Sequence, residues 1–383
     1  MINISVVTGT RADYGLLFWL LKGLKEDNAF NLEIVATGSH LSELHGDTYK
    51  FIEKDGFEIK EKISILTQKD DSTDIAKSTA NAIVGFSDYF DRSHVDIVLI
   101  LGDRYEALAA ASAALFSGIP IMHIHGGEVT SGAYDDMMRH AITKMSHFHC
   151  TTNEEHMKRV IQLGENPKNV KNFGAPGLEG LKKSRLISKE KLSEKLKFEL
   201  RNFFICTYHP ETLSNMSVDT QIKNLLHALD EFPNRQVLFT YPNADDGGRK
   251  IIEYIEEYVS ENSQRCFASS SLGQINYYSA LSYCDLIVGN SSSGIIEAAS
   301  AKVPSVNIGD RQLNRSAANS VINSKNSKND IVKAIKKGLS ENFKNKKNIY
   351  NNPYGEGKTS EDIISWLKSI DFKDRKIFYD LKR

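Results

Sequence analysis

The sequence predicts an α/β fold with two doubly wound domains and a ligand-binding cleft between them. Its length of 383 residues suggests two or three domains, at roughly 150 residues each, and we expect two. Short apolar runs rich in β-branched residues alternate with longer helical patterns, which is typical of parallel sheets covered by helices on both faces. This alternation occurs twice, and a charged, apparently helical stretch at 182–202 separates the two halves.

The strands and helices are expected in strict alternation, and ligands in such sheets bind just beyond the carboxyl ends of the strands. The segments after each strand are therefore the places to search for function. In the first half, we expect strands at 4–7, 32–36, 96–101 and 119–124, and helices at 14–25, 105–116 and 136–145. In the second half, we expect strands at 203–206, 237–240, 286–288 and 305–308, and helices at 219–229, 250–259 and 295–301.

Composition excludes several classes of function. The 48 Lys and Arg residues balance 49 Asp and Glu residues, so the chain lacks the basic surface that a nucleic-acid partner requires. The apolar run from Leu16 to Leu24 is short and interrupted by Lys22, which fits neither a signal peptide nor a membrane span. None of the four cysteines forms a Cys-x-x-Cys pair. We therefore expect a cytoplasmic protein without a membrane partner.

Three carboxylates follow strands of the first half. Asp103 lies directly after the strand at 96–101, where it is either an N-cap of the next helix or a catalytic acid. Glu128 and Asp135 follow the strand at 119–124, and Arg139 is four residues beyond Asp135, at the spacing of an ordinary helical ion pair. Because neighbouring parallel strands end at one edge of the sheet, these acids are expected to converge there, which suits general acid–base catalysis.

The pair His123 and His125 lies two residues apart and shares one face if the strand continues. Such a pair occurs in metal sites, but no further ligands stand at a recognisable spacing. We therefore expect no metal and no cofactor.

The second half contains a candidate phosphate-binding loop, Gly289–Gly294, between a strand and a helix. Its small and hydroxylated residues suit a diphosphate, although an N-capped helix is the plain alternative. Glu297 would repel phosphate and is better suited to hydrogen bonds from a ribose diol. Arg311 follows the next strand and is a candidate for a charge-assisted contact.

Taken together, these segments resemble the UDP-N-acetylglucosamine 2-epimerases, most closely their hydrolysing branch, which feeds sialic-acid and related nonulosonate synthesis. The non-hydrolysing branch usually reads Thr-Arg-Pro-Glu where this chain reads Thr-Arg-Ala-Asp at 10–13. The motifs that carry the resemblance, in chain order, are Gly-Thr-Arg-Ala-Asp-Tyr (9–14), Leu-Gly-Asp-Arg-Tyr-Glu (101–106), His-Ile-His-Gly-Gly-Glu (123–128), Asp-Asp-x-x-Arg-His (135–140), His-Pro-Glu (209–211) and Gly-Asn-Ser-Ser-Ser-Gly (289–294).

The resemblance implies a GT-B-like pair of Rossmann-like domains, 1–181 completed by a helix at 358–383, and 182–357, assembled as a homodimer or homotetramer. It implies hydrolysis of UDP-N-acetylglucosamine to N-acetylmannosamine and UDP, for sialic-acid and capsule synthesis. The same chemistry on a UDP-2,4-diacetamido-trideoxyhexose, a retaining glycosyltransferase and a non-catalytic nucleotide-sugar sensor stay open. The implied UDP-binding residues are Arg11, Arg104, His209, Asn243, Ser291, Ser292, Ser293, Gly294, Glu297 and Arg311. The carboxylates that the resemblance implies in the chemistry are Asp103 and Asp135, and the predicted catalytic set also includes His125, Glu128 and Arg139.

One position departs from the family pattern. Many members carry a catalytic Glu immediately before the Gly-Gly pair, where this chain has His125. His125 titrates in the range needed for acid–base work, and Glu128 is the other candidate if its loop turns inward. The expectation favours His125 because its backbone position matches.

Overall fold

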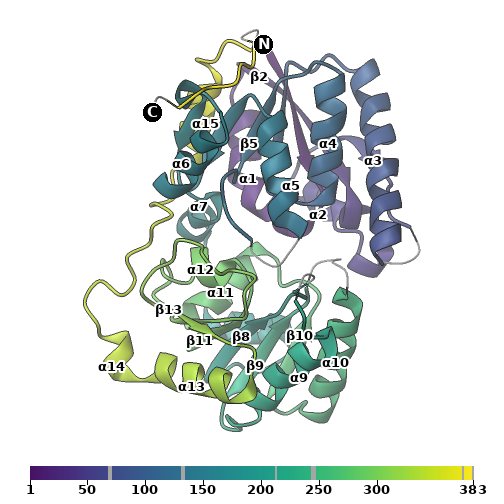
Figure 1. Cartoon of the computed structure of the whole chain (residues 1–383). Helices are drawn as coiled ribbons and strands as arrows, with labels where there is room; N and C mark the ends of the chain where they lie inside the picture. Colours follow the sequence, from purple (N-terminus) through teal and green to yellow (C-terminus); the bar gives the residue numbers. More distant parts are fainter. Residues whose placement is uncertain (68–70, 131–133, 212–213, 243–246, 373–374, 382–383) are drawn as a thin grey trace. The chain divides into compact units, whose positions relative to one another are not determined.

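The computed structural model describes residues 1–67, 71–130, 134–211, 214–242, 247–372, 375–381 of the chain. These residues form two compact units, shown in Figure 1. Unit 1 comprises Met1–Glu128, Asp135–Gly180 and Tyr354–Arg383, and unit 2 comprises Val129–Tyr134 and Leu181–Pro353. The sequence-based boundaries stood at 181/182 and 357/358 and did not set 129–134 apart.

Unit 1 is built on a seven-stranded parallel sheet in the order β3-β2-β1-β4-β5-β6-β7. The order reverses between β1 and β4, which makes the ends of these strands the expected ligand site of a doubly wound sheet. The strands are β1 (Ile2–Thr8), β2 (Phe30–Thr37), β3 (Ile59–Ile63), β4 (Ile97–Leu101), β5 (Ile121–Ile124), β6 (Phe148–Thr151) and β7 (Val170–Asn172). The helices are α1 (Arg11–Glu26), α2 (Tyr49–Lys54), α3 (Ser72–Arg92), α4 (Tyr105–Phe116), α5 (Tyr134–Met145), α6 (Glu154–Gln162), α7 (Pro176–Lys183) and α15 (Thr359–Leu367), with short 3-10 turns at Gly38–Leu41, Glu43–His45 and Pro167–Asn169.

Two apolar layers cover the two faces of this sheet. Helices α3, α4 and α5 lie side by side on one face, where the alanines of α4 allow close packing against Phe86 and Phe90 of α3 (Figure 1). Helices α1 and α15 cover the other face through leucines of α1 and the buried Ile363 and Leu367. Successive residues of β1 point to opposite layers, since Val6 belongs to one and Val7 to the other.

The end of the chain completes unit 1. Trp366 of α15 packs edge-on against Phe148 of β6 and against Phe173. Farther along, Lys376 pairs with the buried carboxylate of Glu165, and the N–H of Tyr379 donates to the carbonyl of Gly164 at 2.9 Å. The last helix and the tail are therefore part of the packing of unit 1.

Unit 2 has a six-stranded parallel sheet in the order β10-β9-β8-β11-β12-β13, with its reversal between β8 and β11. Its apolar side chains also form two layers, one on each side of the sheet. The strands are β8 (Phe203–Thr207), β9 (Gln236–Thr240), β10 (Cys266–Ser269), β11 (Leu286–Gly289), β12 (Ser305–Ile308) and β13 (Val321–Ser324). The helices are α8 (Lys189–Leu196), α9 (Val218–Leu229), α10 (Gly248–Glu261), α11 (Gln274–Tyr283), α12 (Ser293–Ile296), α13 (Lys328–Leu339) and α14 (Glu341–Lys344).

Three expected elements differ from the structure. The helix expected at 358–383 is α15, which covers only Thr359–Leu367, and the described residues after it are not helical. The helix expected at 295–301 is the four-residue α12, and the chain continues in turns to Lys302, whose φ of 59° is left-handed. The strand expected at 119–124 begins at Ile121, after Pro120, whose missing N–H cannot join a ladder. No helix of the described residues is long and apolar enough to cross a membrane.

Candidate active site

Arg139 of α5 organises the acidic site of unit 1. It is 3% exposed, and its Nη2 donates to Asp103 Oδ2. Its Nη1 donates to the carbonyl of His125 at 2.9 Å and lies 3.3 Å from Glu128 Oε2. Burial alone lowers the pKa of Arg139, but the charges of Asp103 and Glu128 outweigh it and raise the pKa. Arg139 is therefore a buried cation held by two carboxylates and not an ordinary surface pair with Asp135.

Asp103 lies in the turn after β4, and it is not the N-cap of α4. That position belongs to Arg104, whose backbone is extended. The side chain of Asp103 is 18% exposed, so one carboxylate serves Arg139 while solvent still reaches the group. Of the two roles left open for Asp103 by the sequence, the structure excludes the cap.

His125 stands beyond the end of β5 in a strained backbone conformation. The strand ends at Ile124, and His125 has a φ of 69°, a left-handed value that is rare for a residue with a side chain. The expectation that His123 and His125 share a strand face is therefore wrong. The left-handed turn brings His125 Nδ1 within 2.7 Å of Glu128 Oε1. Among the described residues, His125 Nε2 is buried without a hydrogen-bond partner.

Glu128 supports the imidazole of His125. The carboxylate is 1% exposed and also accepts a hydrogen bond from Thr152 Oγ1 at 3.0 Å. A carboxylate at Nδ1 favours the tautomer that carries its proton there, which leaves the lone pair on Nε2. The loop does turn inward at Glu128, and the two candidates for one role stand in contact as a His–Glu pair. We call Asp103, His125, Glu128 and Arg139 the charge cluster.

His123 fixes the backbone beside the charge cluster. Its Nε2 lies 2.7 Å from the carbonyl of Gly102 and its Nδ1 lies 3.1 Å from Thr143 Oγ1. Burial lowers its pKa to about 3, so the ring is neutral at physiological pH. No group of three or more His, Cys, Asp or Glu side chains among the described residues is arranged to hold a metal ion. His123 thus serves the turn that presents Asp103.

Asp135 occupies the first turn of α5 and is half-buried. Its charge contributes to the raised pKa of Arg139, one turn farther along the helix. The structure thus places Asp135 near the charge cluster in unit 1, as an electrostatic neighbour of Arg139.

The two arginines predicted to bind UDP in unit 1 have different surroundings. The guanidinium of Arg11, at the first position of α1, lies 3.9 Å from the ring centroid of Phe51, and burial lowers its pKa. Arg104 is 9% exposed, and its Nε lies 3.3 Å from Oε2 of Glu106. Sequence reasoning missed Glu106 as a site residue. The sequence feature that could have identified Glu106 is an acid two residues beyond Arg104, in an otherwise apolar helix.

The loop after β11 in unit 2 requires glycine. Gly289 has a φ of 138°, and a Cβ there would lie 1.9 Å from the carbonyl oxygen of Thr207. A Cβ on Gly294 would lie 2.6 Å from Ser305 Oγ. Between them, Ser293 accepts a hydrogen bond from the hydroxyl of Tyr277 at 2.6 Å, and Glu297 is buried just after α12. The backbone of this loop is therefore tightly constrained.

Asn290 joins this loop to two others at the same sheet edge. Its side chain hydrogen-bonds both polar atoms of the His209 backbone, and its own carbonyl faces Arg311 and Gln312. The structure thus brings His209, Ser291, Ser292 and Arg311 into adjoining loops. Asn243, also predicted to bind UDP, lies outside the described residues.

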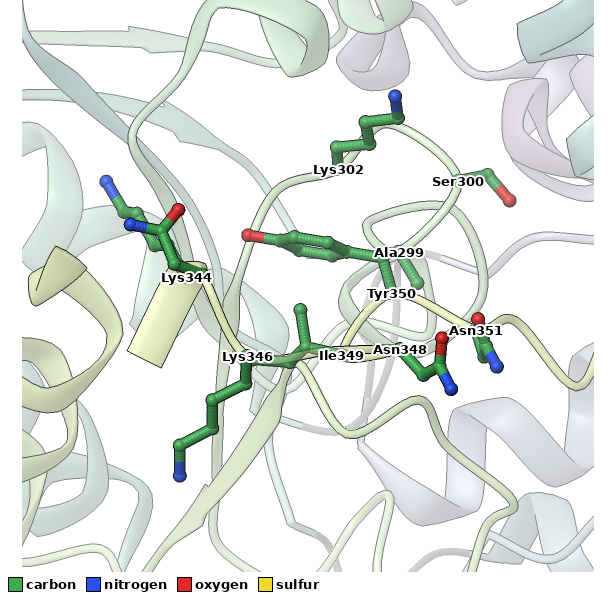
Figure 2. A pocket seen from close by; sticks show the side chains of 10 residues that line it. Ala299, Ser300, Lys302, Lys344, Lys346, Asn348, Ile349, Tyr350 and Asn351 are labelled. Atoms are coloured by element: carbon green, nitrogen blue, oxygen red, sulfur yellow. The ribbon is translucent and has the colours of Figure 1, made fainter. Parts of the chain in front are cut away.

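Unit 2 has a separate hollow of about 470 Å³, which includes Lys302, Lys344, Lys346 and Tyr350 and none of the predicted site residues (Figure 2). In Figure 2 the Tyr350 ring lies centrally and the three lysine side chains point in different directions. The four cysteine thiols are free and buried. Burial raises the pKa of Cys266 to about 11, which disfavours the reactive thiolate.

Comparison with known proteins places the chain among nucleotide-sugar epimerases. A family model described as UDP-N-acetylglucosamine 2-epimerase matches residues 22–368. A GDP/UDP-N,N'-diacetylbacillosamine 2-epimerase (hydrolyzing) of Campylobacter jejuni is 41% identical over 343 residues, which cover 89% of this chain and 88% of that protein. Polysialic acid biosynthesis protein P7 of Escherichia coli is 39% identical over 387 residues, covering 100% and 98%.

The fold is also shared with a solved structure. The UDP-GlcNAc 2-epimerase of Methanocaldococcus jannaschii, in complex with UDP-GlcNAc and UDP, has a TM-score of 0.81 at 19% identity, covering 96% of this chain and 100% of that one. The prediction of two Rossmann-like units of the GT-B-like class is therefore confirmed.

Proposed function

Because the chain belongs to the UDP-N-acetylglucosamine 2-epimerase family, we propose that it is a hydrolysing 2-epimerase acting on a UDP-activated 2-acetamido sugar. With UDP-N-acetylglucosamine and water, the products are N-acetylmannosamine and UDP. The observation that carries the proposal is the charge cluster, in which a buried arginine binds the side chain of Asp103 and a carboxylate orients His125.

The chemistry is elimination followed by hydration. Because the C2 proton is weakly acidic, the C1–O bond breaks first and UDP leaves with the bonding electron pair, while the Asp103 carboxylate stabilises the positive charge that develops at C1. A base then removes the proton from C2, which gives a 1,2-unsaturated sugar. The oxygen of water adds to C1, and a proton returns to C2 from the opposite face.

His125 is the acid–base group in this proposal. Its Nε2 is the atom that exchanges a proton with the sugar, while Glu128 holds Nδ1 and stabilises the imidazolium. Asp135 is the second acid–base group, since it is a half-buried acid whose charge acts on Arg139 of the charge cluster. Arg139 holds the side chains of Asp103 and Glu128 in place and touches no reacting atom.

The leaving diphosphate requires positive charge and hydrogen-bond donors. In unit 2 these are His209, Arg311 and the hydroxyls of Ser291 and Ser292, and Glu297 accepts from the ribose. In unit 1 the added cations are Arg11 and Arg104. Asn243, Ser293 and Gly294 remain predicted contacts of the same nucleotide.

The sugar has two candidates, because the Campylobacter relative is a diacetylbacillosamine epimerase. The test supplies UDP-N-acetylglucosamine and UDP-N,N'-diacetylbacillosamine separately, without any acceptor, and measures UDP release. We expect UDP from at least one of them, with deuterium at C2 of the product when the solvent is D2O. Release that depends on an added sugar acceptor would indicate a glycosyltransferase, and a product without deuterium at C2 would exclude the elimination.

A cytoplasmic location, a homodimeric or homotetrameric assembly and a role in sialic-acid synthesis remain predictions. Buried reduced thiols fit a reducing compartment. Size-exclusion chromatography with light scattering measures the assembly directly.

A further inference from the structure

We propose that Asn290 is a positioning residue of the UDP site, which rests on the proposed function. Asn290 is 1% exposed and stands at the turn directly after β11. It has no place among the predicted contacts with UDP. Its effect on the ligand passes through two predicted contacts, His209 and Arg311, whose loops it joins.

The side chain of Asn290 reproduces a pair of backbone hydrogen bonds. The N–H of His209 donates to Asn290 Oδ1 at 2.7 Å, and Asn290 Nδ2 donates to the carbonyl of His209 at 2.8 Å. The strands β8 and β11 pair only as far as Thr207 and Gly289. The amide therefore continues the pairing past the ends of both strands and fixes the peptide that carries the His209 imidazole.

The backbone of Asn290 holds a third loop. Its carbonyl oxygen accepts from Gln312 Nε2 at 2.9 Å and lies 3.3 Å from Arg311 Nη1. The same third loop is tied back to the first, because Oε1 of Glu211 accepts from the N–H of Asp310 at 2.9 Å. Three loops that are distant in sequence thus form one closed set of hydrogen bonds.

The asparagine amide satisfies both His209 atoms, whereas an ionised aspartate or an alanine does not. Aspartate keeps the acceptor for the N–H but sets a carboxylate oxygen against the His209 carbonyl, so two acceptors face each other. Alanine leaves a buried N–H and a buried C=O without their partner. Either change releases the His209 peptide, and the aspartate also brings negative charge to a site proposed to hold a diphosphate.

The test measures binding of UDP by calorimetry to the full chain, its Asn290→Ala and Asn290→Asp variants, and the control Asn345→Asp. The control makes the same change of charge as Asn290→Asp. Asn345 is exposed and lies in unit 2 outside these loops, so its substitution leaves their hydrogen bonds in place. At pH 8 we expect Kd to rise about 10- to 100-fold for Asn290→Ala, further for Asn290→Asp, and less than twofold for Asn345→Asp.

A pH series separates positioning from simple loss of structure. When the pH is lowered until the carboxyl of Asn290→Asp becomes protonated, its O–H can donate to the His209 carbonyl, so UDP affinity should recover relative to Asn290→Ala at the same pH. Binding by Asn290→Ala within twofold of wild type, or no recovery of Asn290→Asp, would overturn the proposal.

Folding of each variant is checked by circular dichroism. If the Asn290 variants do not fold, Gln312→Leu replaces them, because it removes the donor to the Asn290 carbonyl and leaves the His209 bonds in place. We expect its Kd to rise about threefold to tenfold, and an unchanged Kd would count against the proposal. Failure of the wild-type chain to bind UDP would contradict the proposed function instead.

Discussion

The charge cluster of unit 1 and the loops joined by Asn290 in unit 2 are held together by different forces. In unit 1, three ionised or ionisable side chains surround the buried guanidinium of Arg139. In unit 2, the neutral side-chain amides of Asn290 and Gln312 bind backbone atoms, and the Glu211 carboxylate accepts from the N–H of Asp310. The unit 2 loops follow β8 and β11, where the strand order reverses, and the charge cluster of unit 1 lies beyond β4 and β5, beside the reversal between β1 and β4.

The two kinds of cluster suit two different functions, catalysis and ligand binding. Charges in a buried cluster respond to a charge or proton that appears during a reaction, so the unit 1 arrangement suits chemistry. Neutral hydrogen bonds keep a rigid shape at any pH near neutrality, so the unit 2 arrangement suits binding of a ligand that keeps its charge. We therefore expect substitutions in unit 1 to affect turnover and those in unit 2 to affect affinity.

The largest expected effect comes from Asp103→Asn. The substitution removes the negative charge that balances Arg139 and that would stabilise positive charge at C1. Turnover should therefore fall about 10³-fold, while UDP affinity stays within threefold. Steady-state release of UDP and calorimetry with UDP measure the two quantities. A near-normal rate would remove Asp103 from the chemistry, and a matching loss of UDP affinity would erase the contrast between the units.

His125→Gln and Glu128→Gln test the His–Glu pair. Loss of the imidazole should lower kcat about 10²- to 10³-fold, because no proton can be exchanged at that position. Glu128→Gln keeps the imidazole and should lower kcat only about tenfold, with a shift in the pH–rate profile, since the carboxylate no longer favours the imidazolium. Equal losses with an unchanged pH profile would make Glu128 the group that reacts.

Gly289→Ala tests whether unit 2 depends on shape. Its Cβ would collide with the Thr207 carbonyl, so we expect a loss of about 3 kcal/mol in the free energy of unfolding. Gly46→Ala is the matched control, because Gly46 also has a positive φ, of 83°, but its Cβ would meet nothing within 4 Å. The free energy of unfolding of that variant should fall by about 1 kcal/mol, from backbone strain alone. Denaturant titrations compare the two, and equal losses would deny the collision.

Glu165 tests a charged cluster of unit 1 away from the predicted site residues. Burial disfavours its ionised form, but hydrogen bonds from His149, Lys144 and Lys376 prevail and lower its pKa to about 2. A lowered pKa stabilises the fold above the unfolded value near 4.5, and this contribution disappears as pH falls toward 2. Glu165→Gln should therefore lower the free energy of unfolding by about 2 kcal/mol at pH 7. The difference from the wild-type chain should shrink below pH 4.5. A deficit independent of pH would contradict the charge assignment.

Much of the fold was predictable because both sheets are parallel. Buried parallel strands such as β4 and β8 read as unbroken apolar runs, which are easily recognised. The edge strand β3 was missed because three consecutive charged residues separate its two isoleucines, which leaves no apolar run to recognise. The long helix α3 was missed as well, since its many small and polar residues give little apolar pattern.

The site was predictable as a set of residues but not as an arrangement. Strand ends pointed to Asp103, His125 and Glu128, yet the contact between His125 and Glu128 depends on a left-handed residue that no pattern predicts. Arg139 read as a surface partner of Asp135, because helical spacing says nothing about which face is buried. Asn290 was hidden inside a motif interpreted as a phosphate loop.

The packing of α15 and the tail onto unit 1 orders events during synthesis. Ribosomes add roughly 5–20 residues per second, and domains fold as their residues emerge. Unit 2 uses no residue beyond Pro353, whereas unit 1 needs Ile363, Leu367 and Lys376. Unit 2 can thus fold before unit 1, whose packing requires α15 and the tail. If unit 2 binds UDP as proposed, a nascent chain would acquire affinity for the nucleotide before it acquires turnover.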